Sequence, residues 1–216
     1  MTGILGDDDH RGLFAFFAFA AGVLSLLLFL FPLVYVPHAP GELLPIFERH
    51  RGVYMALAVL VLAWATVSVP CAVAMGRLVA GGGRGLSLAA VLCCSGGILL
   101  VAFAIFVFVG ALLAIVAAAA AAPTPAAADY QAAVWNNLSF FLADPGLMVM
   151  GLGQVLLAWL SRKSAAFSTA TNVVGFVGGA AGLLTLVTYQ TSILAMVQVG
   201  AFGVWAVVAG AVVRRR

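Results

Sequence analysis

Long runs of apolar residues alternate with short polar segments along the chain. The hydrocarbon core of a bilayer is about 30 Å thick, and roughly 20 helical residues cross it. The apolar runs reach that length and are continuous, which predicts helices; a β-barrel would need alternating apolar and polar positions. We therefore expect an all-α, polytopic transmembrane helical bundle of six helices, at about residues 13–36, 53–75, 86–116, 134–160, 168–188 and 192–213.

The composition supports a single transmembrane domain over residues 1–216. Hydrophobic residues make up 65% of the chain and charged residues 8%, which is too little charge to cover a soluble protein of this size. The net charge of +3 does not indicate nucleic-acid binding, because the basic residues are spread over several loops. The first apolar run follows an acidic segment, which favours a retained first helix over a signal peptide.

The basic residues predict the orientation of the bundle. Six helices place both termini on one side of the membrane, and that side also receives most of the Lys and Arg residues: Arg11, Arg77, Arg84, Arg162, Lys163, Arg214, Arg215 and Arg216. Only Arg49 and Arg51 fall on the other side. Cytoplasmic loops carry the excess of basic residues, so we expect cytoplasmic termini and a multi-pass protein of the bacterial inner (plasma) membrane.

One carboxylate, Asp144, lies inside the fourth predicted helix. An ionisable group at membrane depth is costly and marks a candidate functional site. Counting back from Ser161 places Asp144 roughly 25 Å from the cytoplasmic boundary, in the outer third of the hydrocarbon core. Asn137 shares its helical face and Gln198 has a similar depth in the last helix. These three side chains would meet if the two helices are neighbours.

Two interpretations of Asp144 stay open. Asp often caps a helix and Pro fits its first turn, so the helix would begin at Pro145 and Asp144 would be an N-cap or an ion-pair partner of Arg49 or Arg51. Alternatively, Asp144 is a functional carboxylate within a longer helix. The deciding observation is whether the backbone is helical through residues 142–144.

The densest charge in the predicted outer half is the run Glu48, Arg49, His50 and Arg51. Glu48 and Arg51 are three residues apart and can pair on one helical face, which is typical of a solvated belt at the membrane surface. The sharper hypothesis is a binding site for an anionic head group or substrate, because arginine matches carboxylate and phosphate geometry. No metal-ligand spacing or phosphate-binding loop is present, so we expect no metal and no cofactor.

Small residues predict where helices approach closely. Gly175, Gly179 and Gly182 recur at three- and four-residue spacing in the fifth predicted helix, a pattern that lets two backbones come together. We expect this face to pack against another helix, including one from another membrane subunit. Buried packing is also expected for the three cysteines, which form no redox motif.

The layout resembles uncharacterised bacterial six-helix integral membrane proteins of about this length. The resemblance rests on Arg11-Gly12 opening the first helix, the basic turn at 159–163, the glycine-rich fifth helix and an aromatic-bearing last helix that ends in Arg. This chain has Ala165-Ala166-Phe167 where a Pro-Arg-Trp type of motif is expected before the fifth helix. The resemblance implies a fold and carries no activity.

The scarcity of polar residues within the apolar runs favours a non-catalytic lipid-binding or accessory membrane subunit, with membrane lipids as its partners. The alternative is a membrane enzyme acting on a lipid or isoprenoid, with Asp144 or Glu48 as the catalytic general acid, since desolvation favours the protonated carboxyl that such an acid needs. A small-solute transporter is a third hypothesis, and the lack of an internal repeat weakens it.

Overall fold

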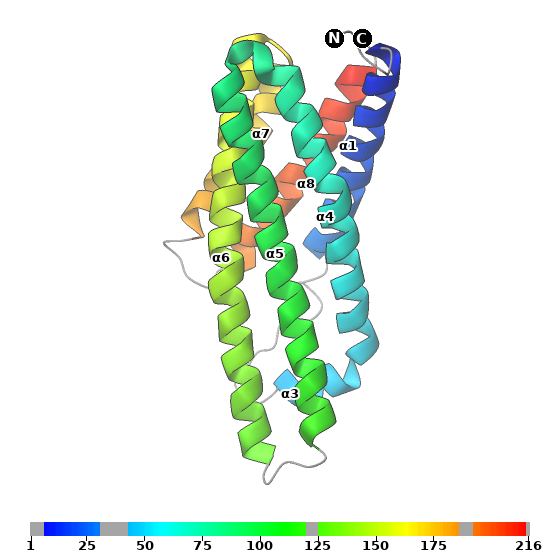
Figure 1. Ribbon diagram of the computed structural model, residues 1–216, viewed down its shortest axis with the longest axis vertical. Coiled ribbons are helices and arrows are strands. Elements are labelled where there is room, and N and C mark those ends of the chain that lie inside the picture. The colour runs from blue at the N-terminus through cyan, green and yellow to red at the C-terminus, as the bar shows by residue number, and fades with distance from the viewer. Residues whose placement is uncertain (1–6, 31–42, 120–124, 186–191, 215–216) are drawn as a thin grey trace.

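The chain folds as a bundle of α-helices (Figure 1). The computed structural model describes residues 7–30, 43–119, 125–185 and 192–214, and within these ranges it contains no strand. The helices are α1 (Asp7–Leu30), α3 (Leu43–Arg49), α4 (Arg51–Val79), α5 (Arg84–Ala119), α6 (Pro125–Ser164), α7 (Thr169–Leu184) and α8 (Ser192–Arg214), with a 3-10 turn, η1 (Ala80–Gly82), between α4 and α5. The predicted all-α class is confirmed.

Five helices, α1, α4, α5, α6 and α8, are long and apolar enough to cross a bilayer. The protein is therefore built as a multi-pass membrane protein. The remaining apolar helix, α7, has 16 residues and measures roughly 24 Å. A count of six crossings stays a prediction, because α7 is shorter than a full span.

Several predicted bounds were too narrow. Residues 134–160 were expected as the fourth helix, whereas α6 begins at Pro125 and runs for 40 residues. Its first turns are rich in alanine, a strong helix former, and Ala128 and Ala132 are buried against the bundle. The predicted ends of the first and fifth helices, at residues 31–36 and 186–188, lie outside the described residues.

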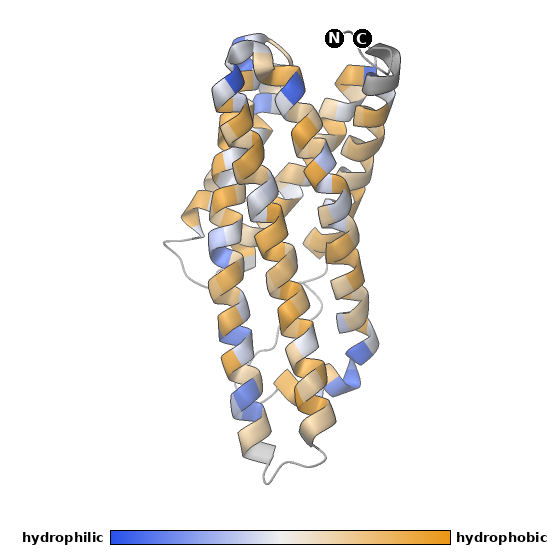
Figure 2. Ribbon diagram, in the orientation of Figure 1, coloured by the Kyte–Doolittle hydropathy of each residue, from blue (hydrophilic) through white to orange (hydrophobic). Residues whose placement is uncertain are grey.

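The helices are arranged in two tiers (Figure 1). The long helices α4, α5 and α6 run the full height of the molecule. Helices α1, α7 and α8 pack on them at one end only, where α1 begins and α8 ends, and the short α3 lies at the opposite end. Hydrophilic residues gather towards both ends, with a mostly hydrophobic stretch between them (Figure 2). We call these the terminal end and the α3 end.

The described basic residues divide between these ends as the sequence indicates. The terminal end holds six of them, all near the ends of their helices: Arg11, Arg77, Arg84, Arg162, Lys163 and Arg214. The α3 end holds Arg49 and Arg51. The terminal end therefore holds most of the described basic residues, and Asp7, Asp8 and Asp9 of α1 lie at the same end.

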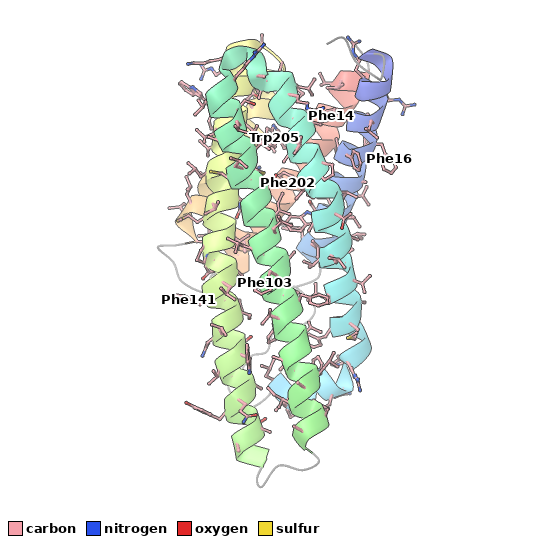
Figure 3. The ribbon with its side chains drawn as sticks, viewed as in Figure 1. Phe14, Phe16, Phe103, Phe141, Phe202 and Trp205 are labelled. Carbon is pink, nitrogen blue, oxygen red and sulfur yellow. The ribbon has the colours of Figure 1, made fainter. Side chains whose placement is uncertain are left out.

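Each tier has its own core. The upper core joins α1, α4, α5, α6 and α8 around large buried side chains such as Trp64, Phe202 and Trp205 (Figure 3). Trp64 Nε1 donates a hydrogen bond of 2.8 Å to Ser25 Oγ, which ties α4 to α1 inside this core. The lower core forms where Phe47 of α3 packs between the ends of α4, α5 and α6.

Glycine sets the distance between the two longest helices. A Cβ added at Gly97 of α5 would collide with the backbone of Gly146 and Met150 in α6. A Cβ at Gly153 would lie 2.7 Å from Ala90 O on the other helix. Such close backbone contact is the packing that small residues permit between membrane helices.

Candidate functional site

Asp144 lies within a continuous helix. Residues 142–145 are helical and Pro145 is inside α6, so the prediction that Asp144 caps a helix beginning at Pro145 is wrong. Proline removes one backbone hydrogen bond, but membrane helices tolerate it where neighbouring groups compensate. Next to Pro145, α6 packs closely on α5 at Gly146, where an added Cβ would lie 3.0 Å from Leu100.

The exposed face of α5 indicates where the hydrocarbon core lies. Its exposed large apolar residues are Leu86, Leu88, Leu92, Leu99, Leu100, Phe103 and Phe106. Beyond them the exposed positions are small: Gly110, Ala114, Ala117 and Ala118. Leu86 and Phe106 are roughly 30 Å apart along the helix, which equals the thickness of the hydrocarbon core. This stretch of α5 therefore fits one crossing, and the rest of the helix extends beyond it.

Two exposed tryptophans on α6 give a second, independent measure. Trp135 and Trp159 are roughly 36 Å apart along the helix, close to the spacing of the two interfacial belts where tryptophan concentrates. Lys163 Nζ lies 5.7 Å from the centre of the Trp159 ring, and this places a basic group beside that belt.

These measures place Asp144 inside the hydrocarbon stretch, near its α3 end. Helices α5 and α6 are antiparallel neighbours, and Gly146 lies against Leu100 and Val101. Asp144 therefore lies at a level of α5 between Val101 and Phe106, and its side chain is half-buried. Its expected position in the outer third of the core stays a prediction.

Helices α6 and α8 are neighbours, as the expected polar cluster required. Gln198 is fully buried, and its Nε2 donates a hydrogen bond of 2.8 Å to Leu147 O. Asp144 is less than one turn from Leu147 along α6. Asn137 is exposed and lies roughly 15 Å along α6 from Leu147, so the three predicted side chains do not form one cluster.

The charged run on α3 and α4 forms a separate surface. Glu48, Arg49 and Arg51 are exposed, and His50, which joins the two helices, is half-buried. Phe47 anchors this corner: it is fully buried, and its ring centre is 5.1 Å from that of Tyr54.

The charged corner is distant from Asp144. It packs at the level of Ala128 and Ala132, and Asp144 lies roughly 18 Å from Ala132 along α6. That separation is too large for a direct ion pair of Asp144 with Arg49 or Arg51. The two candidate acids, Asp144 and Glu48, therefore do not share one site.

The glycine face of α7 is used within this chain. A Cβ at Gly175 would lie 3.0 Å from Ala158 of α6 and from the Trp205 ring of α8, and a Cβ at Gly179 would meet Val155 of α6. A Cβ at Gly182 would meet the Gln198 amide. Close packing of this face is confirmed, and its partners are α6 and α8. A further membrane subunit stays a prediction and needs another surface.

One polar group at this junction was missed from the sequence. Gln154 of α6 is fully buried, and its amide faces Gly178, where an added Cβ would lie 2.6 Å from Nε2. Neither polar atom of that amide has a hydrogen-bond partner among the described residues. Its position inside an apolar run was the available signal, since a glutamine there has to face protein rather than lipid.

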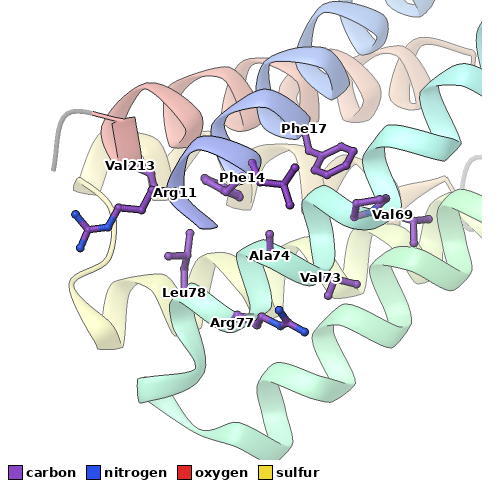
Figure 4. Close-up of a pocket in the computed structure, with 11 residues that line it drawn as sticks. Arg11, Phe14, Phe17, Val69, Val73, Ala74, Arg77, Leu78 and Val213 are labelled. Atoms are coloured by element: carbon purple, nitrogen blue, oxygen red, sulfur yellow. The ribbon is translucent and has the colours of Figure 1, made fainter. Parts of the chain in front are cut away.

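Two hollows among the described residues lie between helices on the surface of the molecule. The larger of the two has a volume of about 620 Å³ and lies between α1 and α4, with Arg11 and Arg77 at its rim (Figure 4). A second, of about 540 Å³, lies between α4 and α5 and is lined almost entirely by apolar side chains. Val69 and Pro70 line both hollows, so the two are adjacent across α4.

No group of three His, Cys, Asp or Glu side chains that could hold a metal ion exists among the described residues. Cys71 and Cys94 are buried, and Cys93 is half-buried. The chain matches no protein-family model, no curated protein and no solved structure. The fold itself defines the class: an α-helical, multi-pass integral membrane protein.

Proposed function

We propose that the protein is a non-catalytic, lipid-binding integral membrane protein of the bacterial inner membrane. One observation carries the proposal: the large hollows in the described part of the chain open between helices at the surface and have mainly apolar walls. Lipid chains fill such grooves, because the grooves face the hydrocarbon region and offer dispersion contacts along their length.

The buried polar groups support the same proposal. Several of them join helices: Ser87 Oγ donates to Gly76 O at 2.6 Å, and Ser161 Oγ donates to Asn172 Oδ1 at 2.8 Å. These bonds join successive helices rather than line a water-filled path. A transporter or a pore needs polar groups along such a path.

The orientation belongs to the proposal as well. The basic terminal end faces the cytoplasm under the positive-inside rule, and α3 with its charged corner lies outside. Helix α7 makes a sixth crossing, because a bilayer thins locally around a helix that is several ångströms short.

The test is to purify the protein in a mild detergent, measure bound phospholipid, and incubate it with inner-membrane lipids. We expect lipid to remain bound and to be recovered chemically unchanged by mass spectrometry. Recovery of protein without lipid would contradict the proposal. So would a new lipid product that the Asp144→Asn or Glu48→Gln variant no longer forms.

Asp144 gives one reason to keep a second candidate, a membrane enzyme acting on a lipid or isoprenoid. It lies half-buried within a long apolar helix, where an ionisable side chain is costly and marks a candidate functional group. The product analysis above separates the two candidates, because only the enzyme makes a product that depends on Asp144.

A further inference from the structure

The groove between α1 and α4 combines positive charge at its rim with an apolar wall (Figure 4). Arg11, at the start of α1, and Arg77, in the last turn of α4, both line it and are exposed. No acidic residue is among the described residues that line this groove. The charged side chains among these lining residues are therefore both cations, which an anion would complement, and Asp7, Asp8 and Asp9 precede Arg11 on α1.

The arginines lie at the level of a membrane interface. Ser87 of α5 donates a hydrogen bond to Gly76 O, the residue before Arg77, so Arg77 lies beside the first turn of α5. Leu86 in that turn is the first of the exposed large apolar residues that mark the hydrocarbon stretch. Arg77 therefore lies at the membrane level where the phosphates of lipid head groups are found.

The wall of the groove runs from this interface into the membrane. Phe14 and Phe17 form its α1 side, and Val69, Val73 and Ala74 form its α4 side (Figure 4). From Arg77 to Val69 the groove is roughly 12 Å deep, close to half of a ~30 Å core. An acyl chain of one leaflet thus fits beneath a head group held at the rim.

The adjoining groove extends this wall. It begins at the shared residues Val69 and Pro70 and continues past Ala65 to Leu62 on α4, against Phe103 and Phe106 of α5. Pro70 lies inside α4 and faces both grooves. A second acyl chain, or the end of a long one, has an apolar surface there.

We propose that the groove between α1 and α4 is a binding site for an anionic phospholipid of the leaflet at the terminal end. Arg11 and Arg77 bind the head-group phosphate, and the acyl chain lies along Phe14, Phe17 and Val73. Basic pockets between membrane helices bind anionic head groups in this way. The inference rests on the proposed lipid-binding function and adds the lipid class and the site.

The charge at the rim decides between lipid classes. A zwitterionic lipid brings a cation that two arginines repel, whereas a net-negative head group does not. Inorganic phosphate has no apolar part to contact the wall, so it would bind far more weakly than the lipid. If a helix of a partner protein occupied the groove instead, its binding would not depend on the lipid head group.

The experiment is native mass spectrometry of the full chain with phosphatidylglycerol or phosphatidylcholine of identical acyl chains. The wild type should bind phosphatidylglycerol more tightly. The Arg11→Gln/Arg77→Gln variant should lose about tenfold in phosphatidylglycerol affinity and little in phosphatidylcholine affinity. The matched control is Arg84→Gln/Arg162→Gln, which removes two exposed arginines of the same end that do not line the groove, and it should keep the preference.

A second variant tests the apolar wall without changing charge. Ala74→Phe fills the groove and should lower the affinity for both lipids, with a melting temperature near that of the wild type showing that the chain still folds. If Ala74→Phe does not fold, the arginine variants still decide. Equal affinities for both lipids in the wild type, or equal losses in the arginine variant and its control, would overturn the inference. If only this site is wrong, the total amount of bound lipid would stay unchanged. If the proposed lipid-binding function is wrong, the protein would carry no bound lipid at all.

Discussion

At the scale of single residues, the glycines show what a sequence can and cannot assign. Of the adjacent glycines Gly96 and Gly97 in α5, Gly97 alone packs closely, since a Cβ at Gly96 would meet nothing within 4 Å. The close contacts of Gly22 and Gly203 between α1 and α8 were not predicted. Which glycine faces a neighbour depends on helix rotation, and an almost uniformly apolar helix such as α5 carries little sequence signal for its rotation.

The adjacent glycines give a matched pair for a stability test. Gly97→Ala should lower the free energy of unfolding in detergent by about 1–3 kcal/mol, because the added methyl group forces α5 and α6 apart. Gly96→Ala should be neutral or raise it by up to about 1 kcal/mol through helix propensity. Melting temperatures of both variants check this, and equal effects would show that the α5–α6 contact is not as close as described.

Polar residues follow the same pattern. Residue counting predicts a depth for Asp144 because helix rise is fixed, and that depth stays a prediction. Its partners could not be predicted, since they depend on which helices are neighbours. Gln198 met α6 as expected, through the backbone of Leu147 rather than through Asp144 or Asn137. Arg11 and Arg77 were recognised as topological signals, and their shared groove required knowing that α1 packs against α4.

At the scale of helices, the apolar runs predicted class and approximate position, and the ends were less certain. Helix α6 begins at Pro125, upstream of its predicted start at residue 134, in an alanine-rich segment. It is stabilised there by α3, which packs its buried face on α4, α5 and α6. A seven-residue helix such as α3 is stable only through that tertiary packing.

Phe47 should hold α3 in place. Phe47→Ala removes a fully buried ring from the lower core and should cost about 3–5 kcal/mol locally, which frees α3. Hydrogen exchange at the backbone amides of α3 should rise strongly, with the rates in α8 unchanged. Phe141→Ala is the control, because that ring is 64% exposed and its loss leaves no cavity (Figure 3). An unchanged exchange rate in α3 would show that Phe47 is not its anchor.

At the scale of the whole molecule, the bundle is longer than a bilayer is thick. Helix α5 has 36 residues and measures roughly 54 Å, against about 30 Å of hydrocarbon. The difference predicts that the ends of α4, α5 and α6 that pack with α3 extend beyond the hydrocarbon core. The proposed lipid site and the proposed orientation both depend on that placement.

The most direct test is cysteine accessibility along α5 in intact cells, in a background with the three native cysteines replaced by alanine. Ala117→Cys should react with a membrane-impermeant maleimide from outside, and Gly85→Cys only after the membrane is permeabilised. Leu99→Cys, between them, should stay unreactive in both conditions, because its exposed face meets lipid. Labelling of Leu99→Cys in intact cells, or of Ala117→Cys only after permeabilisation, would contradict the account.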